Sequence, residues 1–100
     1  MPGHGHGEYK MPGGKLCVAD IELEDGVLHQ ASISGDFFME PDSLLDAINA
    51  ALSGLALPAD AARIERVIAA ALPADAQLYG TSPAAIAAAV QRALLDGANP

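Results

Sequence analysis

The chain has 100 residues, of which 51% are hydrophobic, and its formal net charge is −8. This length suits a single domain with a modest core and leaves little room for a deep, enclosed active site. The hydrophobic content excludes an acidic disordered tail. The negative charge argues against nucleic acid and anionic membranes as partners, because both bind clusters of basic side chains.

Cysteine usage and hydropathy narrow the class further. The single cysteine, Cys17, excludes an intrachain disulfide and a four-cysteine zinc site. The N-terminal residues lack the apolar core of a signal peptide, and no apolar run approaches the ~20 residues that cross a bilayer. We therefore expect a cytoplasmic protein.

Two strands are predicted after a glycine- and proline-rich opening. Residues 1–14 indicate a flexible arm that leads into the first strand, and residues 15–100 indicate one domain. The residues expected to face the core are Cys17, Ala19, Ile21 and Leu23 in a strand over 15–24, and Val27, Ala31 and Ile33 in a strand over 27–34. A two-residue turn at Asp25 and Gly26 would point these two sets to opposite sides, so we predict a three-residue loop over 24–26.

Three amphipathic helices are predicted over residues 41–53, 61–72 and 83–96. Pro41 suits a first helical position, and Asp60 and Ser82 suit N-caps. The expected helix ends are marked by Gly54, Pro73 and Gly97. Since strands come first and helices follow, the fold class is predicted to be α+β. A small antiparallel sheet, formed by the N-terminal hairpin, should be covered by the three helices.

The sequence contains no pattern typical of a catalytic centre. His4 and His6 could approach a metal ion, but two ligands on a glycine-rich arm make a weak site, and we predict no functional metal. Cys17 is in phase with the buried face of its strand, which favours a small buried hydrophobe over a nucleophile. His29 is expected to share a face with Ala31 and to be partly buried.

Two short segments indicate a partner-binding surface. The first, 10–15, places two lysines around a Pro-Gly-Gly turn, where glycine amides and ammonium groups can hold an anion. The second, 34–38, contains both phenylalanines of the chain. Adjacent side chains on a strand point to opposite faces, so one ring should pack under the first helix and the other should reach a partner or a second sheet. Asp36 equally suits an ordinary turn or cap ahead of the first helix.

Taken together, residues 9–16 (YKMPGGKL), residues 33–38 (ISGDFF) and Pro41 resemble the accessory, C-terminal-type domain of lipoate-protein ligases. In that family a Lys-x-Pro-Gly-Gly-Lys-Leu segment opens a strand and an acidic hairpin follows. An Ile-x-Gly-Asp-Phe-Phe segment then leads through a proline into the first helix. The likeness covers residues 9–55 in order and spacing, and continues more loosely through the helices. A 100-residue chain that begins with its own methionine resembles the split form of these enzymes.

The resemblance implies a non-catalytic subunit that binds a catalytic subunit and enables ATP-dependent adenylation of lipoate and its transfer to lipoyl domains. It also implies that the chain binds no cofactor alone, and that lipoate, ATP and magnesium belong to the complex. The catalytic domain's lipoate loop and catalytic lysine have no counterpart here. The residues placed near the subunit interface and the adenylate by this resemblance are Lys10, Gly13, Gly14, Lys15, Gly35, Asp36, Phe37 and Phe38.

Two alternatives remain open at this point. The same small fold resembles the scaffold and sulfur-acceptor proteins of iron–sulfur cluster assembly, in which case Cys17 would accept sulfur. That role requires an exposed position and conflicts with the strand phase of Cys17. A generic protein-interaction module is the third hypothesis.

Overall fold

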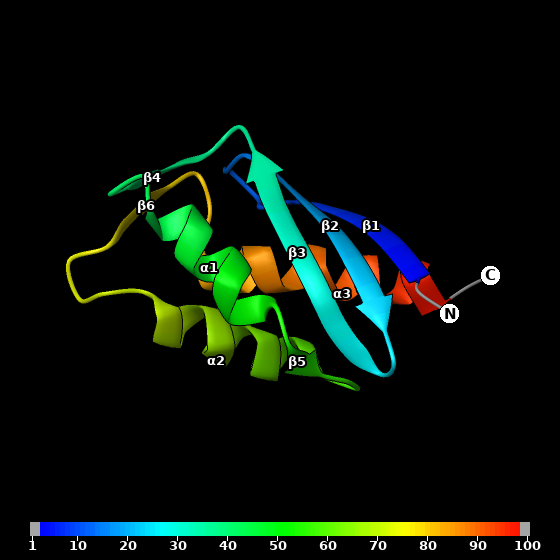
Figure 1. Ribbon diagram of the computed structural model, residues 1–100. Coiled ribbons are helices and arrows are strands. Elements are labelled where there is room, and N and C mark those ends of the chain that lie inside the picture. The colour runs from blue at the N-terminus through cyan, green and yellow to red at the C-terminus, as the bar shows by residue number, and fades with distance from the viewer. Residues whose placement is uncertain (1–2, 99–100) are drawn as a thin grey trace.

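The computed structural model describes residues 3–98, which form six strands and three helices (Figure 1). The elements in chain order are β1 (Gly3–Lys10), β2 (Leu16–Glu24), β3 (Val27–Gly35), β4 (Phe38–Glu40), α1 (Leu44–Leu52), β5 (Leu55–Ala56), α2 (Ala61–Ala71), β6 (Gln77–Tyr79) and α3 (Pro83–Ala98). Four strands form an antiparallel sheet in the order β1-β2-β3-β5, and β4 and β6 form a separate antiparallel pair. The predicted α+β class is confirmed.

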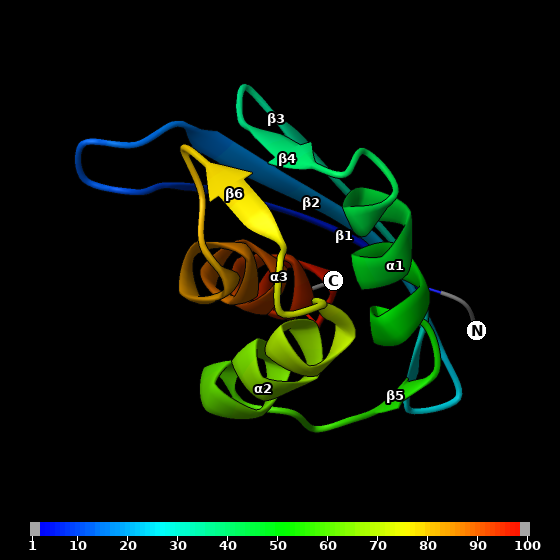
Figure 2. The ribbon, with the colours of Figure 1, turned by 90° about the vertical axis from the view of Figure 1, so that its left-hand side faces the viewer.

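The helices form one layer against one face of the sheet (Figure 2). Helix α3 packs on β1 and β2, α1 packs on β3, and α2 packs against both α1 and α3. The largest side chains buried between the layers are Ile21, Leu28, Ile48, Leu52, Ile64, Ile68, Ile86 and Val90. The opposite face of the sheet carries mostly exposed polar side chains. Within residues 3–98, no helix combines the length and apolar character that crossing a bilayer requires.

The hairpin between β2 and β3 corrects the predicted loop. Asp25 and Gly26 both have positive φ and form a two-residue turn that pairs Glu24 with Val27. A bulge then shifts the register, because Leu23 pairs with Leu28 whereas Glu22 pairs with Gln30. The extra residue in β3 places Ala31 and Ile33 on the same face as the buried residues of β2. The bulge therefore resolves the conflict for which the three-residue loop was predicted.

The bulge also changes which side chains of β3 are buried. Leu28 is fully buried, whereas Val27 is only partly buried. His29, which was expected to be partly buried, is the unpaired bulge residue and is exposed. The first strand follows its prediction, with Cys17, Ala19 and Ile21 at 0–1% exposure and Leu23 packed at the core's edge.

Residues 3–10 form strand β1, so the expectation of a flexible arm over 1–14 is wrong for this segment; residues 1–2 lie outside the described residues. The strand alternates glycines on its inner face with His4, His6 and Glu8 on its outer face. A Cβ added at Gly7 would meet the backbone of Ala89 and Ala93, and one at Gly5 would meet the carbonyl of Ala93. The glycines therefore let α3 lie directly against the strand.

The helices begin and end close to their predicted positions. Asp60 caps α2 by accepting a hydrogen bond from the Arg63 amide at 2.8 Å, and the Ser82 hydroxyl accepts one from the Ala85 amide at 3.1 Å. Helix α1 begins at Leu44, three residues after the Pro41 start that the sequence favoured. Helix α3 continues through Gly97, which was expected to end it.

Candidate functional site

The two segments singled out in the sequence meet at one end of the sheet, which we call the hairpin end. It consists of residues 10–16, 35–38 and 79–81. Lys10 ends β1 opposite Leu16, and Gly35 ends β3 opposite Cys17, so both segments lie at the same end of the ladder. The turn between β1 and β2 projects from this end of the molecule (Figure 2).

A third segment, which no sequence pattern links to the other two, completes the hairpin end. The Lys15 amide donates to the carbonyl of Gly80 at 2.9 Å, and the Asp36 amide donates to the carbonyl of Leu16 at 3.3 Å. The Ser82 hydroxyl lies 3.7 Å from the sulfur of Met11. Three parts of the chain are thus joined by their backbones at this surface.

Close contacts explain two of the glycines at this end. Gly35 has a φ of +155°, and a Cβ there would meet the Leu16 carbonyl and the Phe37 ring. Gly80 has a φ of +84°, and a Cβ there would lie 2.6 Å from Cγ of Lys15. The aliphatic stem of Lys15 therefore lies along the backbone at Gly80. Lys15 as a whole is an exposed residue.

The proposed anion cradle of glycine amides is only partly compatible with this geometry. The Gly14 amide donates to the Met11 carbonyl at 2.8 Å and closes the turn, and the Lys15 amide is bonded to Gly80. Two of the backbone donors of the segment are therefore used inside the chain. The cationic groups that can meet an anion at this end are the side chains of Lys10 and Lys15, both in exposed residues.

Phe37 and Phe38 differ in burial, although only Phe38 lies in a strand. Phe37 is half-buried and packs against the core, whereas Phe38 is 59% exposed and lies on β4. The Phe38 ring stacks on the ring of Tyr79 in β6, with centroids 4.5 Å apart and planes at 18°. Tyr79 is itself 39% exposed, and its hydroxyl donates to the side chain of Gln77. The pair forms an exposed aromatic surface at the hairpin end.

The charges of the hairpin end differ from those of the rest of the chain. Its three segments contain Lys10 and Lys15 against one carboxylate, Asp36, in a chain whose net charge is −8. Two ammonium groups suit an anionic group or an acidic partner surface and do not suit a magnesium ion. Over residues 3–98, no three His, Cys, Asp or Glu side chains are grouped so that they could hold a metal ion.

Cys17 is inaccessible in this fold. Its side chain is fully buried, and burial raises the pKa of the thiol to about 11, which the neighbouring Thr81 hydroxyl offsets only in part. A protonated thiol without solvent contact is a poor nucleophile and a poor sulfur acceptor. The sulfur-acceptor alternative therefore loses the residue on which it depended.

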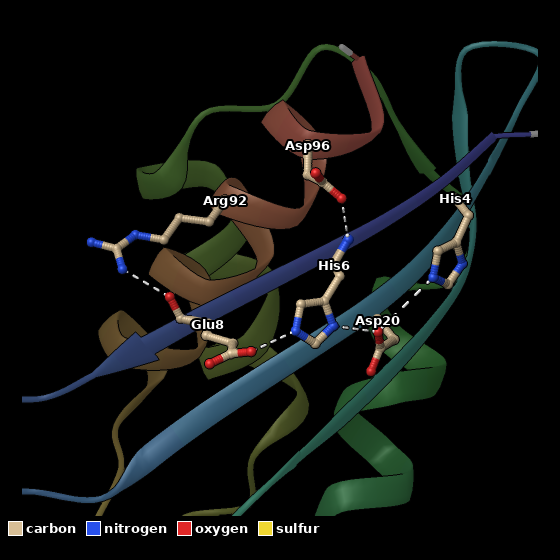
Figure 3. Close-up of polar contacts among 6 residues, drawn as sticks. All are labelled: His4, His6, Glu8, Asp20, Arg92 and Asp96. Atoms are coloured by element: carbon tan, nitrogen blue, oxygen red, sulfur yellow. Dashed lines mark hydrogen bonds and ion pairs between the residues drawn. The ribbon is translucent and has the colours of Figure 1, made fainter. Parts of the chain in front are cut away.

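A second polar cluster lies on the open face of the sheet (Figure 3). The Nδ1 atom of His6 lies 2.6 Å from Oδ1 of Asp20, and its Nε2 atom lies 2.7 Å from Oε2 of Glu8. Hydrogen bonds to Glu8 and then Asp20 raise the pKa of His6 from 6.5 to about 9. His6 is therefore protonated at neutral pH. An imidazolium held by two carboxylates has no lone pair for a metal ion.

We expect this pKa to make stability fall as the pH rises. Between the ordinary histidine value of 6.5 and about 9, the folded chain binds the proton more tightly than the unfolded chain. The stabilisation is fully present below pH 6.5 and is lost as the pH rises through 9. Urea unfolding across this range should show the decline in the native chain and a flatter profile in His6→Gln.

An NMR titration of the His6 ring checks the cause directly. Asp20→Asn should move the imidazole pKa down toward 6.5, because one of the two carboxylate partners is lost. Glu22→Gln serves as the matched control, because Glu22 lies on the same strand as Asp20 but does not contact His6. Titration of His6 near 6.5 in the native chain would contradict the cluster as described.

Comparison with known proteins gives one informative likeness. No protein-family model and no curated protein matches the sequence. A chain in the solved structure of an archaeal lipoylation system from Thermoplasma acidophilum, described as a bi-partite lipoate protein ligase and its E2 lipoyl domain, has a similar fold. The TM-score is 0.64 at 21% sequence identity, over 92% of this chain and 93% of that chain. The fold of this protein is therefore one that occurs in a lipoylation system.

Tyr79, Gly80 and Thr81 are the residues of the hairpin end that the sequence did not identify. Strand β6 has only three residues, with half-buried Leu78 between exposed neighbours, and this alternation is too short to predict a strand. Its partner β4 is equally short. The pairing of Phe38 with Tyr79 depends on two segments that are remote in sequence, so local patterns do not predict it.

Proposed function

We propose that this chain is the accessory, non-catalytic subunit of a lipoate-protein ligase, and that its hairpin end docks on the catalytic subunit. The observation that carries the proposal is the convergence of residues 10–16 and 35–38 on one surface. These are the two segments with the family resemblance, and they are joined there by backbone hydrogen bonds. The fold likeness to a chain of an archaeal lipoylation system supports the same assignment.

The chemistry of the hairpin end fits docking better than catalysis. Its exposed aromatic pair provides rigid apolar area of the kind that dominates protein interfaces. Its two lysines can meet acidic groups of a partner or the phosphate of an adenylate. We assign lipoate, ATP and magnesium to the catalytic subunit, as the family resemblance implies.

A reconstitution experiment tests the proposal. The purified chain alone should form no lipoyl-adenylate from lipoate and ATP. Added to a catalytic subunit that lacks an accessory domain, it should switch on adenylation and the transfer of lipoate to an apo lipoyl domain. An equal rate with and without this chain, although the two proteins bind, would refute an accessory role.

Lys15 allows a sharper test of the adenylate-facing part of the proposal. Lys15→Met retains the apolar stem beside Gly80 and removes only the charge. We expect an unchanged melting temperature and an adenylation rate lower by about tenfold to hundredfold, since a hydrogen bond to a charged group contributes roughly 1.5–3 kcal/mol. The rate should be measured with the catalytic subunit saturated.

Lys15→Arg is the matched control and should retain most of the activity, because it keeps a cation on a long stem. Equal rates for native, Met and Arg variants would show that Lys15 faces no anionic group in the complex. The docking role of the hairpin end would then depend on its aromatic pair.

A further inference from the structure

Strand β1 is an edge of the four-stranded sheet (Figure 1). Half of its backbone groups therefore point away from β2. In an antiparallel ladder, alternate residues point their N–H and C=O groups to the outer side. In β1 these are the even-numbered residues, because the His6 amide and the Glu8 carbonyl both bond to groups outside the sheet. Such an edge is a template for another strand.

Helix α3 covers this edge with two side chains (Figure 3). The His6 amide donates to Oδ2 of Asp96 at 2.9 Å, and Nη1 of Arg92 donates to the Glu8 carbonyl at 2.8 Å. The guanidinium carbon of Arg92 also lies 5.1 Å from the centre of the Tyr9 ring, which holds it in place. Arg92 and Asp96 therefore occupy neighbouring hydrogen-bonding positions along the edge.

The fit has a geometric cause. Four residues of helix advance about 6 Å, and two residues of strand advance about 6.8 Å, so one helical turn matches one strand repeat. Because α3 runs antiparallel to β1 at backbone contact, Ala89 and Ala93 meet Gly7 and Gly5 in turn. Arg92 lies one residue before Ala93 and reaches the Glu8 carbonyl. Asp96 lies four residues further along the same helix face and reaches the His6 amide.

The other edge of the sheet, at β3 and β5, is covered differently. Strand β5 pairs with Val27 and Leu28 only, and the Ile33 amide further along β3 donates to the side chain of Asn49 in α1 at 3.0 Å. Both edges of the sheet are thus bonded by polar side chains of helices. The β1 edge is covered by two exposed side chains alone, without a further strand.

We propose that Arg92 and Asp96 are a guard that keeps this chain from pairing, through β1, with a second copy of itself. A second copy fits the unguarded edge. In an antiparallel pairing with Gly7 opposite Gly7 of the second copy, His6 of each copy would lie opposite Glu8 of the other. The pairing between an imidazolium and a carboxylate, now made within the strand, is then also available across the interface.

The test is the mass of the Arg92→Ala/Asp96→Ala variant in sedimentation equilibrium over a range of concentrations. The native chain should stay at 10.2 kDa, and the variant should approach twice that mass as concentration rises. Hydrogen exchange should become slower at the β1 amides of the variant on association. The matched control is Arg63→Ala/Glu65→Ala, which removes the same charges from exposed positions of α2 and should stay monomeric.

A folded double variant that stays monomeric at every concentration would overturn the proposal, as would a native chain that already pairs through β1. Should the double variant fail to fold, Arg92→Ala and Asp96→Ala separately decide in the same way, since each frees one backbone group. The single variants should associate more weakly than the double variant. Their failure to associate, with folding shown by circular dichroism, would likewise overturn it.

Discussion

Gly7→Ala is expected to lower the free energy of unfolding by about 1–3 kcal/mol, the cost typical of forcing an extra group into a packed interior. The new Cβ would meet the backbone of Ala89 and Ala93, and backbone atoms cannot rotate away as a side chain can. Helix α3 would have to move off β1. For a chain of this size the melting temperature should fall by roughly 4–8 °C per kcal/mol.

Gly3→Ala is the matched control, because Gly3 lies on the same strand and the same face. A Cβ at Gly3 would lie 3.8 Å from Leu23 and 3.9 Å from the Gly97 carbonyl, which are ordinary contacts. This variant should be neutral or up to about 0.5–1 kcal/mol more stable, since alanine loses less backbone entropy in a strand than glycine. Equal stability of the two variants in urea unfolding would contradict the close packing of α3 on β1.

The Phe38→Ala/Tyr79→Ala variant is expected to bind the catalytic subunit at least about 30-fold more weakly. Aromatic anchors at the centre of an interface typically contribute about 2 kcal/mol or more, which corresponds to that factor. The two rings stack on one another and are both exposed, so they would be buried together by a partner. Calorimetric titration of the catalytic subunit measures the dissociation constant, and the lipoylation assay should fall in parallel at low subunit concentration.

Leu95→Ala separates docking from a general loss of exposed apolar area. Leu95 is 58% exposed, nearly the same as Phe38 at 59%, but it lies near the opposite end of α3 from the hairpin end. It should bind the catalytic subunit with unchanged affinity. If instead Leu95→Ala weakens binding and the aromatic variant does not, the docking surface has been placed at the wrong end of the molecule.

Much of the fold was predictable because its signals are local. The alternation through Cys17, Ala19 and Ile21 gave the correct buried face, and Asp60 and Ser82 gave the correct helix starts. The register of the hairpin was not predictable in the same way. Its turn residues indicated a two-residue loop, and only the bulge at His29 reconciles that loop with a single buried face.

The candidate site was predictable as two segments and not as a surface. The lysine-rich turn at 10–15 and the phenylalanines at 37–38 differ visibly from an ordinary amphipathic chain. The third segment, with Tyr79 and Gly80, carries no comparable local signal. Its place beside Lys15 and Phe38 depends on a hydrogen bond and a ring stack between residues remote in sequence.

By itself, the sequence determined the α+β class, the three helices and the phase of β2, because 3.6- and 2-residue periodicities are properties of single segments. Only the tertiary structure decided the role of the alternating glycines in residues 3–7. Glycine next to polar residues indicates mobility when read locally. In the folded chain these glycines lie against Ala89, Ala93 and Gly97 of α3, and they allow backbone contact between the strand and the helix. Burial of that contact orders the segment.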